Sequence, residues 1–149
     1  MLKGVDPLLG PDLLGVLRAM GHGDELAIVD ANFPAAARAR RLCRSEGVDA
    51  VRMLQAVVSV LPLDDFEPVA VWRMATVNPA DDPPAIAAAF ESTLRAAGYG
   101  APVGFLEREA FYNRAGAAFA VAATGETRLY GNLILRKGVI RPAGDRHAD

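Results

Sequence analysis

Short apolar runs alternate along this chain with longer segments of helical spacing, and this alternation restricts the fold more than any other feature. The run LAIVD, residues 26–30, is continuously apolar up to its aspartate, which is typical of a strand covered on both faces. The preceding segment, residues 11–20, begins with a proline, places Leu13 and Leu17 on one face and is followed by a glycine. Helices alternating with buried strands predict an α/β sandwich around a largely parallel or mixed sheet.

The rest of the chain continues the alternation. A capping aspartate, leading prolines and helical spacing predict helices over residues 49–61 and 83–98, with a shorter helix over residues 109–117. Runs of β-branched and small apolar residues predict strands over residues 69–77, 103–107, 118–124 and 132–137. Residues 35–46 stay undecided, because alanine and arginine favour a helix while no clean apolar stripe is present. The strand order does not follow from these patterns.

The length of 149 residues fits one domain, which we expect over residues 1–140, followed by a polar, flexible tail at residues 141–149. His147 lies in that tail, and we assign it no role. The N-terminal segment carries acids and prolines where a signal peptide needs an unbroken apolar stretch. No run reaches the roughly 18–20 apolar residues of a membrane span, so a soluble, cytoplasmic protein is expected.

Charge and ligand chemistry exclude several classes of partner. Sixteen basic and 18 acidic residues give a net charge of −2 without a basic stripe, so nucleic acid is not an expected partner. The single cysteine, Cys43, precludes an intrachain disulfide, and with His147 in the tail the nitrogen and sulfur ligands are too few for zinc. No glycine-rich phosphate motif follows a strand. We expect no metal and no cofactor.

One candidate site centres on the segment GHGDELAIVDANFP, residues 21–34. His22 stands between two glycines, which leave room for a small molecule, and Asp24 could hold one ring nitrogen and fix the tautomer. Asp30 ends the apolar strand, where open α/β sheets place their ligands. A structural interpretation is also open, because a histidine at a helix end often binds terminal carbonyls and an aspartate often forms a turn.

His22 and Asp30 are expected at opposite ends of one strand, about 15 Å apart if the chain is extended. Either the chain folds back near Asp24, or a neighbouring subunit completes the pocket. This spacing is a first indication of an oligomer.

The remaining candidates lie in the C-terminal third of the chain. Arg108 and Tyr112 occur in LEREAFYNRA, and the latter could offer an apolar wall or belong to the core. Tyr130 and Asn132 provide a hydroxyl and an amide around Gly131, a set suited to the vicinal hydroxyls of a sugar. The same triplet could be a plain turn into the last strand.

These segments resemble a known family. MLKGVDPLLGPDLLGVLRAMGHGDELAIVDANFPA and FYNRAGAAFAVAATGETRLYGNLILRKGV are similar to the two ends of the D-ribose pyranase / L-fucose mutarotase (RbsD/FucU) family, above all its fucose branch. The combination of GHxDxxxxxDAxxP with a C-terminal YGN is fairly specific, and the match weakens through residues 35–46 and 76–104. The resemblance implies an RbsD-like three-layer α/β sandwich in a ring oligomer, typically a homodecamer, with sites where subunits meet.

The resemblance also implies an isomerase that needs neither metal nor cofactor. The chain is then expected to interconvert the α and β anomers of L-fucose, or of a related free monosaccharide, by acid/base opening and closure of the ring. His22 resembles the family's general acid/base, and four further residues resemble its sugar-binding set: Asp30, Arg108, Tyr130 and Asn132. Asn32 and Glu109 depart from the fucose branch, where histidine and phenylalanine are common, so the sugar stays open. A D-ribose-type pyranase and a non-catalytic monosaccharide-binding protein are the alternatives.

Overall fold

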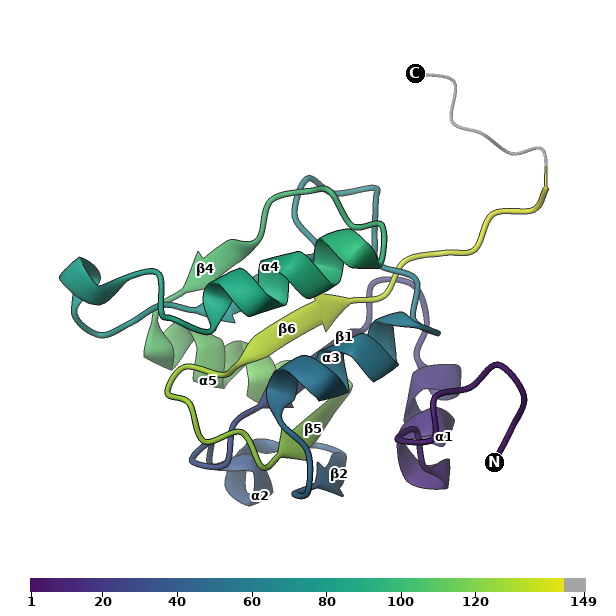
Figure 1. Cartoon of the computed structure of the whole chain (residues 1–149), viewed down its shortest axis with the longest axis horizontal. Helices are drawn as coiled ribbons and strands as arrows, with labels where there is room; N and C mark the ends of the chain where they lie inside the picture. The colour runs from purple at the N-terminus through teal and green to yellow at the C-terminus, as the bar shows by residue number, and fades with distance from the viewer. Residues whose placement is uncertain (144–149) are drawn as a thin grey trace.

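A computed structural model describes residues 1–143 of the chain (Figure 1). Helices and strands alternate over most of that length, as the sequence pattern predicts. The helices are α1 (Pro11–Ala19), α2 (Ala35–Arg38), α3 (Ala50–Val58), α4 (Ala87–Ala96) and α5 (Arg108–Ala117), with a 3₁₀ turn at Pro79–Asp81. The strands are β1 (Glu25–Val29), β2 (Leu42–Ser45), β3 (Val71–Met74), β4 (Gly104–Leu106), β5 (Ala120–Thr124) and β6 (Leu133–Arg136).

The six strands form one sheet in the order β2-β5-β1-β6-β3-β4. Strands β1 and β5, β2 and β5, and β3 and β4 pair in parallel. Among residues 1–143 only β6 runs antiparallel to its neighbours, β1 and β3. The expected largely parallel or mixed sheet is therefore confirmed, and its two central strands are β1 and β6.

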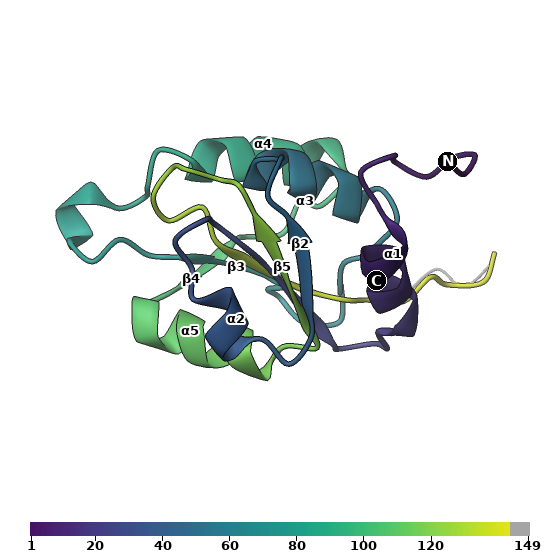
Figure 2. The same cartoon turned by 90° about the horizontal axis from the view of Figure 1, so that it is seen from below.

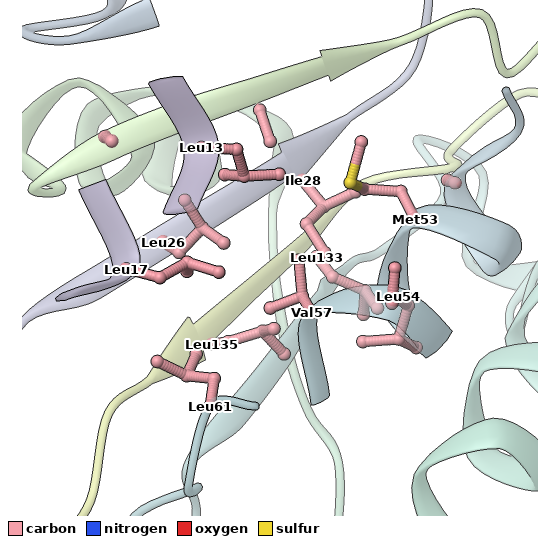
Figure 3. Packing of buried hydrophobic residues seen from close by; sticks show 14 of the residues in the cluster. Leu13, Leu17, Leu26, Ile28, Met53, Leu54, Val57, Leu61, Leu133 and Leu135 are labelled. Carbon is pink, nitrogen blue, oxygen red and sulfur yellow. The ribbon is translucent and has the colours of Figure 1, made fainter. Parts of the chain in front are cut away.

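Helices cover both faces of the sheet, with α3 and α4 on one side and α2 and α5 on the other (Figure 2). The larger apolar core lies under α3 and α4 and also takes in α1: Leu13 of α1, Met53 of α3 and the sheet residue Ile28 belong to it (Figure 3). A smaller core on the opposite face includes Phe33, Phe111 and Ile134. The three-layer sandwich is confirmed.

Several boundaries differ from the sequence prediction. The undecided segment 35–46 divides into the short helix α2 and the edge strand β2. The helix expected from residue 83 begins at Ala87, because Pro84 disfavours a helical backbone at Pro83 and residues 84–87 form a turn in which the amide of Ala87 donates to the carbonyl of Pro84. Residues 144–149, which include most of the expected flexible tail and His147, lie outside the described residues. Within residues 1–143, no helix combines the length and the apolar character needed to cross a membrane.

The direction of β1 defines two edges of the sheet, and these names are kept below. The amino edge lies where β1 begins and β6 ends, and it holds the loops 21–24, 62–66 and 137–138. The carboxyl edge lies where β1 and β3 end and β6 begins, and it holds the segments 30–33, 75–77 and 125–132. Because β6 is antiparallel to β1, β6 runs from the carboxyl edge to the amino edge, whereas β1 runs from the amino edge to the carboxyl edge.

Candidate active site

The carboxyl edge holds a buried aspartate–asparagine pair. The backbone amide of Asp30 donates to Oδ1 of Asn132 at 2.9 Å, and Nδ2 of Asn132 donates to Oδ2 of Asp30 at 2.7 Å. The other carboxylate oxygen accepts from the amide of Asn32 at 3.0 Å. Asp30 is 6% exposed and Asn132 3%. The reciprocal bonds fix both side chains and join the end of β1 to the start of β6.

Burial raises the pKa of the Asp30 carboxyl above its usual value, while hydrogen bonds from Asn132 and from backbone amides act in the opposite direction. A carboxylate with a raised pKa is a better hydrogen-bond acceptor than an exposed aspartate. The backbone amides of Phe33 and Gly131 also face this carboxylate, and each carboxylate oxygen can accept more than one hydrogen bond. Asp30 is thus suited to accept a hydrogen bond from a ligand hydroxyl.

Tyr130 comes two residues before Asn132 and has a left-handed backbone, with φ of 62°. For a residue other than glycine this conformation costs roughly 1–2 kcal/mol. The hydroxyl oxygen of Tyr130 accepts from the amide of Val77 at 3.2 Å, which leaves the hydroxyl hydrogen for another acceptor. A Cβ at Gly131 would lie 2.5 Å from Cγ of Glu126, so only glycine fits between the two polar side chains. The YGN triplet is a turn that presents two polar groups.

Arg108 is the first residue of α5 and lines a pocket of about 560 Å³ together with Val77 and Phe105. Its side chain is 55% exposed, and its Nε lies 3.8 Å from Oε1 of Glu109. Val77 connects this pocket to Tyr130 through the hydrogen bond described above. The structure therefore brings Asp30, Asn132, Tyr130 and Arg108 to one edge of the sheet, with Arg108 at the periphery.

The amino edge holds His22. Its Nε2 lies 3.1 Å from Oδ1 of Asp64, and the side chains are 46% and 2% exposed, respectively. The ring of Phe66 lies 5.1 Å from the imidazole, centroid to centroid, at an angle of 48°. The amide of Phe66 donates to the same oxygen of Asp64 at 3.3 Å. One side of the imidazole is held by these contacts, while nearly half of the side chain is accessible.

Of the two interpretations open for Asp24, a contact with the His22 ring or a turn, the described residues show the turn. Oδ2 of Asp24 accepts from the amide of Gly21 at 2.7 Å, so this carboxylate closes the turn after α1. Asp64, which is 42 positions further along the chain, takes the place beside the ring. The structure thus supports the interpretation of Asp24 as a turn residue.

The segment around Lys137 brings the loop of Asp64 next to the loop of His22. The backbone of Lys137 forms an antiparallel bridge with Leu63, and its carbonyl accepts from the amide of Gly23 at 2.8 Å. Its ammonium donates to the carbonyls of Leu17 and Met20 at the end of α1. The segment after β6 thus holds the loops of His22 and Asp64 side by side. The contact between His22 and Asp64 depends on the order of the strands in the sheet. Local sequence patterns do not contain that order, so the sequence analysis missed Asp64.

The contact with Asp64 assigns different roles to the two ring nitrogens of His22. An ionised carboxylate only accepts hydrogen bonds, so Nε2 carries a hydrogen toward Asp64. Nδ1 then holds the lone pair of the neutral ring. Within residues 1–143, Nδ1 has no hydrogen-bond partner. It is the nitrogen that can exchange a proton with a ligand, and Asp64 can stabilise the charged ring.

The structure does not bring His22 and Asp30 together. The five residues of β1 separate them, which corresponds to roughly 15 Å of strand. Tyr112 also lies apart from the polar pair: its ring packs edge-on against Phe33 at 5.0 Å and beneath the guanidinium of Arg38. Among residues 1–143, no group of three or more His, Cys, Asp or Glu side chains is arranged to hold a metal ion.

Comparison with known proteins identifies the family of this chain. Residues 3–140 match the model of the RbsD / FucU transport protein family. The chain is 44% identical to a fucose mutarotase of Bos taurus, over 95% of this chain and 96% of that protein. It is 45% identical to a fucose mutarotase of Homo sapiens, over 93% and 94%.

Solved structures extend the likeness. The crystal structure of a Streptococcus pneumoniae fucose mutarotase in complex with L-fucose superimposes with a TM-score of 0.86 at 39% identity, covering 94% of this chain and all of that one (100%). The Bacillus subtilis RbsD complexed with D-ribose superimposes with a TM-score of 0.71 at 22% identity, covering 95% and 100%, and shares the fold.

Proposed function

This chain belongs to the RbsD / FucU family, and we propose that it is an L-fucose mutarotase, an isomerase that interconverts the α and β anomers of the free sugar without a cofactor. The observation that carries the proposal is the buried Asp30–Asn132 pair beside Tyr130, in a chain similar over nearly its whole length to fucose mutarotases. A neutral polyol offers many hydroxyls and no charge, and a fixed set of neutral polar groups with one carboxylate suits it.

The proposed reaction moves protons and breaks one carbon–oxygen bond. Opening requires a proton on the ring oxygen and the loss of the proton on the anomeric hydroxyl, so that the bond from the anomeric carbon to the ring oxygen breaks and a carbonyl forms. Rotation about the adjacent carbon–carbon bond presents the other face of the carbonyl. Closure then reverses both proton transfers and gives the other anomer.

His22 supplies the proton transfer in this proposal. On opening, the lone pair of Nδ1 takes the proton of the anomeric hydroxyl, Asp64 stabilises the ring in its charged form, and Nδ1 then gives that proton to the ring oxygen; closure on the other face runs in reverse. Asp30 accepts a hydrogen bond from the anomeric or a neighbouring hydroxyl. Arg108, Tyr130 and Asn132 bind the remaining hydroxyls. One well-placed acid/base contributes about 10²–10⁴-fold, which suffices for a reaction that already proceeds slowly in water.

A complete site in this proposal needs two copies of the chain. His22 lies at the amino edge and the sugar-binding set at the carboxyl edge, so a neighbouring subunit must bring its His22 to the Asp30 of the first. A contact between two different surfaces is heterologous and closes into a ring when the rotation permits. A ring homodecamer, the assembly that the family resemblance implies, satisfies this requirement.

Exposed apolar side chains at both edges support such a contact. Phe66, at the amino edge, is 53% exposed. Val77, Phe105 and Leu129 lie around the carboxyl edge and are 65%, 65% and 67% exposed. Large apolar side chains that cluster at the ends of a sheet are typical of protein contacts. A cytoplasmic location, which the sequence predicts, is part of the same proposal.

Exchange NMR on free sugars tests the proposed activity. Saturation transfer between the anomeric protons is measured for L-fucose, D-ribose, D-galactose and L-rhamnose, with and without the protein. We expect L-fucose to show the largest increase in anomer exchange. A larger effect on pyranose–furanose exchange of D-ribose would instead indicate a pyranase, and saturable binding without exchange would indicate a binding protein.

A further inference from the structure

The loop between β5 and β6 carries both Tyr130 and Asn132, and a buried carboxylate holds it from behind. The side chain of Glu126 is 2% exposed. Its Oε1 accepts from the amide and Nε of Arg128 at 2.8 and 2.9 Å. Its Oε2 accepts from Nη2 of Arg128 at 2.8 Å and from the amide of Ala50 at 3.2 Å. The loop is thereby tied to itself and to the first residue of α3.

The backbone of Glu126 ties the loop to the end of β1. Its carbonyl accepts from the amide of Ala31 at 2.9 Å, next to Asp30. Its amide donates to Oγ1 of Thr124, which in turn donates to the carbonyl of Val29. Glu126 thus joins the end of β5 to the segment that follows β1, next to Asp30.

Close packing transmits this anchor to the polar groups. The position of a Cβ on Gly131 is only 2.5 Å from Cγ of Glu126, so the turn rests directly on the glutamate side chain. Tyr130, the preceding residue, holds a left-handed backbone that surrounding contacts must stabilise. A residue other than glycine keeps such a conformation only while its neighbours stay in place.

We propose that Glu126, with Arg128 as its counter-ion, is a positioning residue for sugar binding: it keeps the loop in the conformation in which Tyr130 and Asn132 meet the sugar. This inference rests on the proposed function of the carboxyl edge. The hydrogen bonds from Arg128 are the main reason that the pKa of Glu126 falls to about 2, so the anchor stays charged in any ordinary buffer. A loop that is only partly in its competent conformation weakens the apparent affinity by that fraction.

The test compares Glu126→Gln with Glu91→Gln, which also removes the charge of a glutamate paired with an arginine but lies on the outer surface of α4. Calorimetric titration with L-fucose gives the dissociation constant, and exchange NMR gives kcat. We expect Glu126→Gln to weaken binding about tenfold, leave kcat within about twofold and speed hydrogen–deuterium exchange of the 125–132 peptide, because fewer loops are competent. A merely structural role would lower kcat with the folded fraction and leave the dissociation constant unchanged.

A milder variant covers the case in which Glu126→Gln does not fold. Arg128→Gln leaves the bonds to the amides of Ala50 and Arg128 in place and should weaken binding in the same direction, by a smaller factor. Wild-type protein that fails to bind L-fucose would contradict the proposed function. Wild-type protein that binds, together with an unchanged dissociation constant in folded Glu126 or Arg128 variants, would overturn the positioning role alone.

Discussion

The two edges of the sheet are built in opposite ways. At the amino edge His22 keeps 46% of its side chain exposed and, within residues 1–143, has one side-chain hydrogen-bond partner, Asp64. At the carboxyl edge Asp30 and Asn132 are at most 6% exposed and bond to each other twice. β1 connects these edges and keeps them apart.

The difference indicates that the two edges suit different roles, proton transfer at one and recognition of hydroxyls at the other. A group that transfers protons must reach its ligand and change charge, so it needs accessibility and a partner for the charged form. A group that recognises hydroxyls must hold its direction, so it benefits from a rigid, satisfied network. Each edge meets one requirement, and neither meets both.

The largest effect is expected from the amino edge. His22→Ala removes the proton-transferring group and should lower anomer exchange by about 10²–10⁴-fold. The fold should remain, because the ring is half exposed, and sugar binding should remain, because the substitution leaves the sugar-binding set unchanged. Exchange NMR on L-fucose measures the rate, with His147→Ala as the matched control. A rate equal to that of the wild type would remove His22 from the mechanism.

The acid dependence of stability tests the carboxyl edge. The pKa of Glu126 is about 2 in the fold and 4.5 ordinarily, so its ionised form stabilises the fold in full above pH 4.5, and the contribution disappears as the pH falls through about 2. The shift corresponds to about 3 kcal/mol. Denaturant unfolding from pH 6 to pH 2 should show the wild type losing this much relative to Glu126→Gln. If the unfolding free energies of the two proteins changed with pH in parallel, the ionised carboxylate of Glu126 would not be stabilised by the fold.

Asn132→Ala tests whether the two hydrogen bonds between Asp30 and Asn132 hold these side chains in place. The change leaves the amide of Asp30 without its acceptor in a buried place, at a cost of about 2 kcal/mol in unfolding free energy. Affinity for L-fucose should fall as well. Asn32→Ala is the control, because among residues 1–143 Asn32 contributes only its backbone amide to this network. Equal unfolding free energies of the two variants would contradict the claim that the hydrogen bonds between Asp30 and Asn132 stabilise this edge.

Asp64→Asn should have the smallest effect, because it keeps a hydrogen-bonding group beside the ring and removes only the charge. We expect kcat to fall about tenfold while the dissociation constant for L-fucose changes little. Asp65→Asn removes a neighbouring carboxylate that is half exposed and serves as the control. An effect as large as that of His22→Ala would mean that Asp64 itself transfers the proton.

The sequence predicted the elements well where one local pattern dominates. Asp30 follows a strand that is buried from Leu26 to Val29, and Asp49 caps α3 by accepting from the amide of Arg52. It failed where contacts span the chain. Asp64 reaches His22 only because Lys137 pairs with Leu63, and this depends on the antiparallel placement of β6.

Glu126 was missed for the same kind of reason. Beside Gly125 it is typical of an exposed turn, and nothing local indicates that Ala31 and Ala50 fold against it. Conversely, the expected separation of His22 and Asp30 needed only the length of β1, and the structure confirms it. Distances along a single strand follow from the sequence, whereas partners across the sheet require its order.

Mixed assemblies test the division between the edges most directly. His22→Ala and Asp30→Ala proteins are each inactive in the proposed mechanism, and they are unfolded together, refolded together and assayed by exchange NMR on L-fucose. If each site joins the amino edge of one subunit to the carboxyl edge of another, random assembly should restore about a quarter of wild-type activity. No recovery in assemblies shown to contain both chains would contradict a site shared between subunits.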